Sequence, residues 1–160
     1  MTRVRFFTGQ QLSASDFATE QAYEIKMRRL HNQMLHGAGV VEGLGVSIAN
    51  EAGVVTVSAG FALDEMGREI IVESDSHVAA GFGAEAVCFV TIQYVERETD
   101  PVPLAKGGSE FSRVSEEFSI QIKADDPQLD PSAQALGLAR LVRRNGEWAL
   151  DESYRVKRPR

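Results

Sequence analysis

The three histidines of this sequence are its first candidates for metal chemistry. His31 and His36 are five residues apart, so on an α-helix their side chains would point about 140° away from each other. They could not hold one metal ion together without other ligands. His77 lies in a different segment, and no cysteine or carboxylate completes a recognisable metal-binding spacing. We therefore expect no metal site and no cofactor, and we interpret His36 as the C-terminal residue of a helix.

Carboxylates are the second group that could do chemistry. Asp64, Glu65 and Glu69 surround the turn residue Gly67, and paired carboxylates can catalyse glycoside hydrolysis. Carboxylates at an exposed hairpin turn are usually solvated, however, and no nucleophile with a Gly-x-Ser-x-Gly pattern occurs in the sequence. We therefore expect no catalytic residues and a protein that is not an enzyme.

Two further patterns have a structural explanation that is simpler than a chemical one. Cys88, the single cysteine, lies in the apolar run Val87–Val90, which is typical of a buried and inert thiol. The segment Gly37–Gly45 is rich in glycine, but phosphate-binding loops follow a strand and open a helix. This segment instead closes a helix and leads into a strand, so we expect no nucleotide-binding site.

The charge balance limits the class of partner. The formal net charge of −6 argues against a nucleic-acid-binding protein, because such proteins usually carry a strong positive field on one face. No run of residues is long and apolar enough to span a membrane, and the N-terminus lacks the apolar segment of a secretory signal. Basic residues form a tail at 155–160, which is either a solvated, frayed end or a segment that docks on an acidic partner surface. The interface candidates in this tail are Arg155, Lys157 and Arg158.

A long amphipathic helix is predicted from about Ser13 to His36. Ser13 and Asp16 match a variant of the capping box, in which the hydroxyl and the carboxylate reach unpaired amide groups of the first turn. Gly37 ends the helix. An apolar stripe with helical spacing consists of Tyr23, Met27, Leu30 and Met34. We expect this stripe to form either the core between the helix and a sheet or a symmetric seam between subunits.

After Gly37 the apolar residues repeat with a period of two, which is typical of β-strands. We predict a strand over 40–48, a turn over 50–53 and a return strand over 54–59. The remaining predicted strands are 61–64 and 68–72 around a turn at 65–67, then 87–95 and 118–123, and finally 136–142 and 148–150 around the turn Arg144-Asn145-Gly146.

Two breaks separate these strands. Residues 96–110 contain two prolines, two adjacent glycines and many polar residues, and we predict a long loop there that bears function. Residues 125–131 form a second break. Together the pattern predicts an α+β, mostly β fold with a long N-terminal helix followed by an antiparallel β-sandwich or barrel-like sheet. We expect a single domain over 1–160, with an N-terminal arm and helix (1–37), a β domain (38–154) and the basic tail (155–160).

Five segments resemble one group of proteins. They are Arg5-Phe-Phe-Thr-Gly-Gln-Gln-Leu up to Phe17, Arg29-Leu-His-Asn-Gln-Met-Leu-His-Gly up to Leu44, Val54 to Val72, Tyr94 to Pro103, and Ala139 to Tyr154. The chain resembles small proteins and N-terminal modules encoded with contractile phage-tail-like injection systems and tailed phages. In its order of helix, β-sandwich and terminal Leu-Asp-Glu-Ser strand, it also resembles the N-terminal shell region of the type VI secretion baseplate adaptor.

This resemblance implies a structural part of a tail or baseplate, often a homotrimer, that links the baseplate to a fibre, spike or neighbouring subunit. It implies protein partners, assembly in the cytoplasm and a final place in a phage tail or tail-like particle. An alternative from another class is a carbohydrate- or cell-surface-binding β-sandwich, in which Tyr94, Trp148 and Tyr154 would stack on sugars. Trp148 decides between the two hypotheses, because a sugar-binding tryptophan must stand in an open groove.

Overall fold

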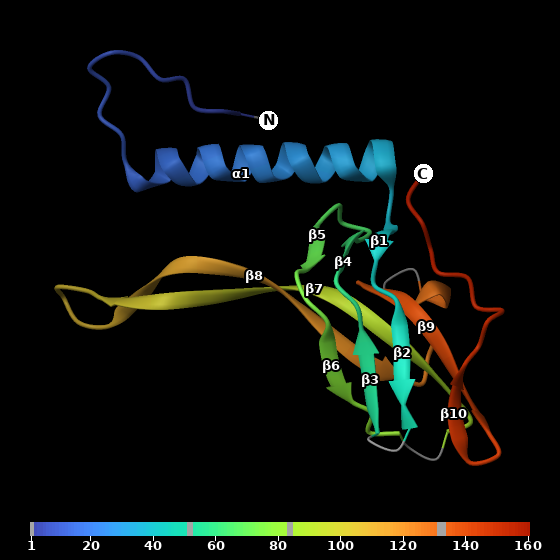
Figure 1. The fold of residues 1–160 in the computed structure, drawn as a ribbon. Helices are drawn as coiled ribbons and strands as arrows, with labels where there is room; N and C mark the ends of the chain where they lie inside the picture. Colours follow the sequence, from blue (N-terminus) through green and yellow to red (C-terminus); the bar gives the residue numbers. More distant parts are fainter. Residues whose placement is uncertain (1, 51–52, 83–84, 131–133) are drawn as a thin grey trace.

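The computed structural model describes residues 2–50, 53–82, 85–130 and 134–160, and shows one helix followed by antiparallel β-sheets (Figure 1). The predicted mostly β, α+β fold is therefore confirmed. The helical elements are α1 (Ala14–His31), a π-helical turn (Asn32–His36) and a 3-10 turn (Pro127–Leu129). The strands are β1 (Gly39–Gly43), β2 (Val46–Ala49), β3 (Val54–Val57), β4 (Gly60–Leu63), β5 (Glu69–Val72), β6 (Ser76–Ala79), β7 (Val87–Pro103), β8 (Ser109–Lys123), β9 (Ala135–Arg144) and β10 (Glu147–Leu150).

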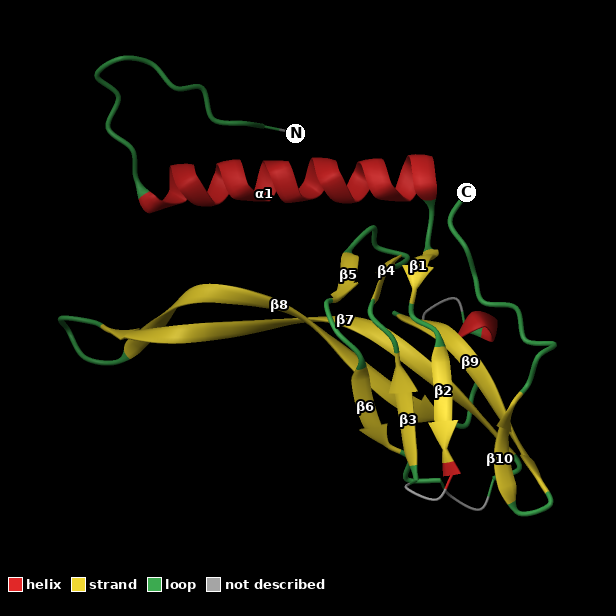
Figure 2. Ribbon diagram, viewed as in Figure 1, coloured by secondary structure: helices red, strands yellow, loops and turns green. Residues whose placement is uncertain are grey.

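Three antiparallel sheets surround a shared core. Their strand orders are β1-β4-β5, β2-β3-β6 and β10-β9-β7-β8. The first two sheets are built from the same three stretches of chain, because β1 leads into β2, β3 into β4, and β5 into β6. They therefore form one layer that bends at these three connections (Figure 2). We call these sheets, without the outer part of the β7–β8 hairpin, the β body.

The bend corrects the predicted strand over 40–48. The chain leaves β1 at Gly43, and Leu44 has a positive φ of 55° before β2 begins. Across the bend the Leu44 amide donates to the Ala59 carbonyl at 3.2 Å, and the Gly45 amide donates to the Ser58 hydroxyl at 2.9 Å. The backbone groups that a straight ladder would have paired therefore find partners within the bend.

The core consists of apolar side chains that alternate along the strands. Val55 and Val57 of β3, Val90 and Ile92 of β7, and Leu141 of β9 are essentially inaccessible to solvent. They come from both layers and belong to one cluster. Burial of this kind is the main favourable contribution to folding, at about 1.5–3 kcal/mol for each large apolar side chain.

The other predicted hairpins are present at nearly their expected places. β4 and β5 pair around the turn at Gly67, and β9 and β10 pair around Asn145-Gly146. Of the predicted turn at 50–53, residues 51 and 52 lie outside the described part of the chain, while the Gly53 amide donates to the Asn50 carbonyl at 3.1 Å. In the break at 125–131, residue 131 also lies outside it. The strand β6 has no counterpart among the sequence predictions.

The predicted loop over 96–110 is wrong. β7 and β8 continue as a paired ribbon with partners from Phe89 and Lys123 out to Pro103 and Ser109, and the turn lies at 104–108. β9 pairs with β7 only as far as Gln93. Beyond that point β7 and β8 have only each other, so the ribbon projects from the β body (Figure 1). We call the segment 97–115 the projecting hairpin.

The helix begins where the sequence predicts and ends in a different geometry. The Asp16 carboxylate accepts a hydrogen bond from the Ser13 amide at 2.8 Å, as the capping box predicts, and a further one from the Ser13 hydroxyl at 2.7 Å. After His31 the chain forms a π-helical turn, in which the Gly37 amide donates to the carbonyl of Asn32, five residues earlier. In a π-helix the hydrogen bonds join residues five positions apart, so a residue lies nearly above the one five positions earlier. The predicted 140° separation of His31 and His36 is therefore wrong, and their Nε2 atoms are 3.3 Å apart.

Candidate protein-binding surfaces

The helix α1 is joined to the β body at its C-terminal end, and none of its residues is buried. The N-terminal arm turns back along it, and the Val4 amide donates to Glu20 Oε2 at 3.2 Å. Of the predicted stripe, Tyr23 is half-buried, while Met27, Leu30 and Met34 are exposed. The helix-to-sheet core, one of the two roles expected for the stripe, is therefore not formed. We define the helix surface as the exposed apolar residues Phe6, Phe7, Leu12, Phe17, Ile25, Met27, Leu30, Met34 and Leu35.

The projecting hairpin carries a second exposed apolar set. We define the hairpin surface as Val102, Leu104, Phe111 and Val114, which are 46–60% exposed. No residue of 97–115 is buried. Sequence reasoning selected this segment as a functional loop but missed Phe111 and Val114. The signal available was the presence of large apolar residues within an otherwise polar stretch.

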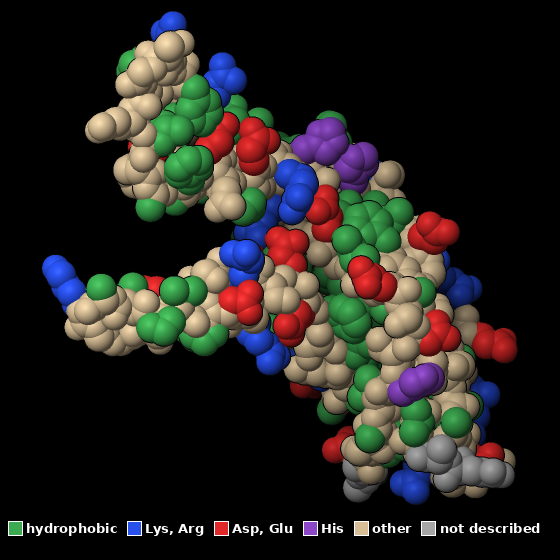
Figure 3. All heavy atoms as spheres, turned by 60° about the vertical axis from the view of Figure 1, so that its left-hand side comes forward, with side chains coloured by type: hydrophobic (Ala, Val, Ile, Leu, Met, Phe, Trp, Pro, Cys, Tyr) green, Lys and Arg blue, Asp and Glu red, His purple; other side chains and the backbone are tan. Residues whose placement is uncertain are grey.

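The helix and the hairpin extend to the same side of the molecule, and the space-filling view shows an open notch between them (Figure 3). Charged side chains lie on both sides of its base in that view. The notch is therefore bordered by two projections that have apolar side chains exposed and few contacts with the β body.

A cluster of polar contacts fixes the helix over the root of the hairpin. Arg29 of α1 forms an ion pair with Glu96 of β7 at 2.7 Å, and the Tyr94 hydroxyl donates to the same Glu96 oxygen at 2.9 Å. Hydrogen bonds from Arg29 and from Tyr94 hold the pKa of Glu96 below its usual value. Burial raises the pKa of the Tyr94 hydroxyl, so it stays protonated and remains a donor. The guanidinium of Arg68 lies 4.9 Å from the Tyr94 ring centroid and adds a cation–π contact.

A second arginine of the helix reaches two sheets. Arg28 pairs with Glu69 of β5 at 3.2 Å and lies 3.9 Å from Glu116 of β8. These side chains are a quarter to a half exposed, and ion pairs of this kind each contribute at most about 1 kcal/mol. They set the direction of the helix more than they stabilise it.

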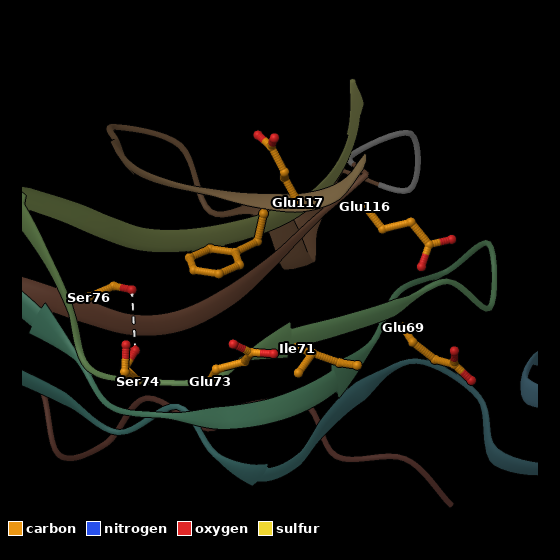
Figure 4. A pocket seen from close by; sticks show the side chains of 8 residues that line it. Glu69, Ile71, Glu73, Ser74, Ser76, Glu116 and Glu117 are labelled. Carbon is orange, nitrogen blue, oxygen red and sulfur yellow. Dashed lines mark hydrogen bonds between the residues drawn. The ribbon is translucent and has the colours of Figure 1, made fainter. Parts of the chain in front are cut away.

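An acidic pocket of about 560 Å³ lies beside this cluster, between β5–β6 and β8. Glu69, Ile71 and Glu73 approach it from one side and Glu116 from the other (Figure 4). Ile71 is 59% exposed in its wall. The pocket therefore combines carboxylates with an accessible apolar side chain, which suits a basic and partly apolar protein segment.

The predicted frayed tail is wrong, because residues 155–160 run back along β1. The Val40 amide donates to the Lys157 carbonyl at 2.8 Å, and the Arg158 guanidinium donates to the Val40 carbonyl at 3.0 Å. Gly39 permits this approach, since a Cβ there would lie 2.5 Å from the Arg158 carbonyl carbon. Lys157 pairs with Glu65, and the Arg155 guanidinium donates to the Glu152 carbonyl at 2.8 Å. All three basic candidates stay exposed, so they remain available to an acidic partner surface.

The three carboxylates of the β4–β5 turn each have a structural role. Asp64 is 2% exposed, accepts hydrogen bonds from the amides of Met66 and Arg68 at 2.8 Å, and pairs with the Arg68 side chain at 2.5 Å. Glu65 binds Lys157, and Glu69 binds Arg28. Each carboxylate of this turn is therefore engaged in a structural contact.

Cys88 and His77 each have separate structural surroundings. Cys88 is 6% exposed, and burial raises its pKa to about 11, as expected of an inert thiol. His77 lies on β6, where its Nδ1 is 2.9 Å from the Thr56 hydroxyl. Across residues 2–50, 53–82, 85–130 and 134–160, no group of three or more histidine, cysteine, aspartate or glutamate side chains could hold a metal ion. The same described ranges contain no helix with the length and apolar character needed to cross a membrane.

The aromatic residues of the sugar-binding hypothesis do not form an open platform. Trp148 is 7% exposed and stacks on Phe82 with ring centroids 4.6 Å apart. Tyr94 is 6% exposed, and the half-buried Tyr154 is held by Gln128 and Asp126 through its hydroxyl. The hypothesis therefore loses the tryptophan on which it depended.

Comparison with known proteins shows a likeness in fold. No protein-family model matches the sequence, and no curated protein matches it. Among solved structures, a chain of the type VI secretion TssK-TssF-TssG baseplate subcomplex matches with a TM-score of 0.65 and 13% identity, over 98% of this chain and 62% of that one. A chain of the baseplate complex from the type VI secretion system matches with a TM-score of 0.55 and 13% identity, over 98% and 59%.

A third structure is TssK from the type VI secretion system of EAEC, in complex with a nanobody. It matches with a TM-score of 0.55 and 14% identity, over 88% of this chain and 54% of the other. In all three comparisons this chain spans little more than half the length of the matched protein. The chain thus has the fold of baseplate proteins from the type VI secretion system, which is a contractile injection system related to phage tails. The resemblance found in the sequence is confirmed at the level of fold.

Proposed function

We propose that this chain is a structural component of the baseplate of a contractile injection system or a related phage tail, where it binds other protein subunits. The likeness in fold to type VI secretion baseplate proteins supports this class of function. The likeness to the first of these structures extends over 98% of this chain, with a TM-score of 0.65.

The single observation that carries the proposal is the pair of projections without buried side chains. Most helical stability in proteins comes from packing of an apolar face, and α1, which has 18 residues, buries none of them. An isolated two-stranded hairpin is marginally stable at best in water. Both projections have apolar residues exposed, and partner chains would bury them.

The finer part of the proposal concerns the assembly. We propose that three copies associate through the helix surface, which is the remaining role for the stripe of Tyr23, Met27, Leu30 and Met34. The hairpin surface then binds a neighbouring subunit or a fibre. The exposed Arg155, Lys157 and Arg158 are the proposed contacts to an acidic surface of a partner. Assembly would take place in the cytoplasm, before the particle is complete.

The proposal is tested on the purified chain and on two hairpin variants, by light scattering for the oligomeric state and by binding to neighbouring baseplate subunits. Residues 98–114 are replaced by Asn-Gly, which joins the paired residues Arg97 and Ser115 by a two-residue turn. A second variant shortens only the turn, replacing residues 105–107 by Asn-Gly between the hydrogen-bonded residues Leu104 and Gly108, so it keeps the whole hairpin surface and is the matched control. We expect the intact chain and both variants to be oligomeric, and only the first variant to lose binding to neighbouring baseplate subunits. A monomer that binds no baseplate subunit would contradict the proposal.

A further inference from the structure

The π-helical turn brings two imidazole rings together on the surface. His31 is the last residue of α1 and His36 is the last residue of the turn. Their Nε2 atoms face each other at 3.3 Å, with ring centroids 5.2 Å apart and ring planes inclined by 56°. Both residues are exposed, and histidine side chains gather at the surface beside the helix in the space-filling view (Figure 3).

This separation matches that of two ligands on one zinc ion. Zinc binds imidazole nitrogen at about 2.0–2.1 Å in tetrahedral geometry, which places two nitrogens on one ion about 3.3–3.4 Å apart. The two Nε2 atoms therefore already stand at the spacing that a shared ion requires. Without an ion, they can approach this closely only if one ring donates its Nε2 proton to the lone pair of the other.

We propose that His31 and His36 form a two-histidine binding site for Zn²⁺, with water in the remaining coordination positions. Both rings would bind through Nε2 and carry their proton on Nδ1. The donor ring would change tautomer on binding, losing its proton at Nε2 and taking one up from solvent at Nδ1, so no net proton is released. Two neutral imidazoles give a weaker site than a structural zinc site with four protein ligands. Glu69 lines the pocket beside His36 but is already held by Arg28 and Asn32, so it is not counted as a ligand.

The histidine pair lies where the helix connects to the β body, so a bound ion would stabilise this connection. The turn Asn32–His36 connects the projecting helix to β1, and π-helical turns are frequently found at functional sites. A zinc ion bound by His31, the residue before the turn, and by His36, its last residue, would hold the π-turn closed against conversion to a regular α-helical turn. The hydrogen bond from the Gly37 amide to the Asn32 carbonyl, 2.9 Å long, would then open less often.

Titration of the metal-free full-length chain with ZnCl₂ tests the site by two measurements. Isothermal titration calorimetry should show one zinc ion bound per chain, and hydrogen exchange should show slower exchange of the Gly37 amide. His31→Ala and His36→Ala should each reduce the zinc affinity at least tenfold and abolish the change in exchange. The third histidine provides the control, so His77→Ala should bind zinc with the affinity of the unchanged chain.

Circular dichroism shows whether each variant is folded before it is titrated. Both histidines of the site are exposed, so the loss of either ring should leave the spectrum unchanged. Absence of zinc binding by the unchanged chain would overturn the proposal. Equal zinc binding by the unchanged chain and the His31→Ala and His36→Ala variants would overturn it as well, and so would loss of binding only in His77→Ala.

Discussion

Asn32 Nδ2 donates a hydrogen bond to the carbonyl oxygen of Gly67 at 2.9 Å, and this contact joins the helix to the β4–β5 turn. Asn32 is the buried residue of the helical segment 14–36, with 7% of its surface exposed. The same Nδ2 also lies 3.2 Å from Glu69 Oε1. The direction of a long projecting helix thus depends on a polar side chain at its last turn.

Asn32→Ala should therefore loosen the helix. The change removes a side chain that satisfies the buried carbonyl of Gly67, and leaving such a group unpaired costs about 1–3 kcal/mol. We expect a lower melting temperature and faster hydrogen exchange in α1, with little change in β3 and β7. Gln33→Ala is the control, because Gln33 is exposed and loses one hydrogen bond, to the Glu65 carbonyl at 3.0 Å. Equal effects of the two substitutions would contradict this role of Asn32.

Gly67→Ala should destabilise the contact between the helix and the β4–β5 turn, because the added methyl group would collide with the helix backbone. Gly67 has a φ of 71°, and a Cβ there would lie 2.2 Å from the Arg29 carbonyl oxygen. Gly53→Ala is a matched control, because Gly53 has a φ of 59° and its Cβ would meet no atom within 4 Å. Both changes carry the cost of a left-handed residue, about 1–2 kcal/mol. We expect Gly67→Ala to lower the free energy of unfolding by more than the control in urea titrations, and a smaller loss would show that the helix moves away freely.

The double substitution Met27→Glu and Leu30→Glu should separate subunits without unfolding them. These side chains are 37% and 39% exposed, so charges placed there are not forced into the core. In an assembled seam the same charges would be buried and would repel each other across the symmetry axis. We expect a monomer by light scattering with the circular dichroism spectrum and melting transition of a folded chain. Loss of the folded spectrum would show instead that the stripe packs within one chain.

The ion pair at the base of the notch should weaken in acid. The pKa of Glu96 is held below its usual value by Arg29 and Tyr94, so its charged form stabilises the folded chain above the unfolded pKa, near 4.5. This contribution is lost as the pH falls through the lowered folded pKa. We expect the stability difference between the unchanged chain and Glu96→Gln to be largest near neutral pH and to shrink below pH 4.5, as measured by urea unfolding. A difference that grows in acid would contradict this assignment.

Much of the fold can be predicted from local patterns in the sequence. The capping box at Ser13 and Asp16 marks the start of the helix, and the alternation around Val90 and Ile92 marks the central strand. These signals work because one face of each element is fixed by solvent or by the core.

The projecting hairpin could not be predicted in the same way. Both faces of the ribbon 97–115 meet solvent, so no apolar alternation is imposed on it. Pro101 and Pro103 argue against a central strand. In this segment, however, β7 pairs only with β8, so its other side is a sheet edge, and an edge tolerates proline. Only Gly107 and Gly108 mark the true turn, with positive φ values of 89° and 85°.

The histidine pair was missed for a geometric reason. Sequence reasoning assumes 3.6 residues per turn, and the insertion of a π-turn changes which residues share a face. The tail at 155–160 was misjudged because its contacts with β1 involve backbone groups, which have no sequence signature.

One strand runs without interruption from the core to the outer turn. β7 has 17 residues, about 55 Å at the usual rise, and its inner half is clamped between β8 and β9. A pull on the outer turn along the strand would load these ladders in shear, so that their bonds resist together rather than one after another. The tip of the molecule is thus joined by one strand to the central sheet, so a pull on the tip would reach the core directly.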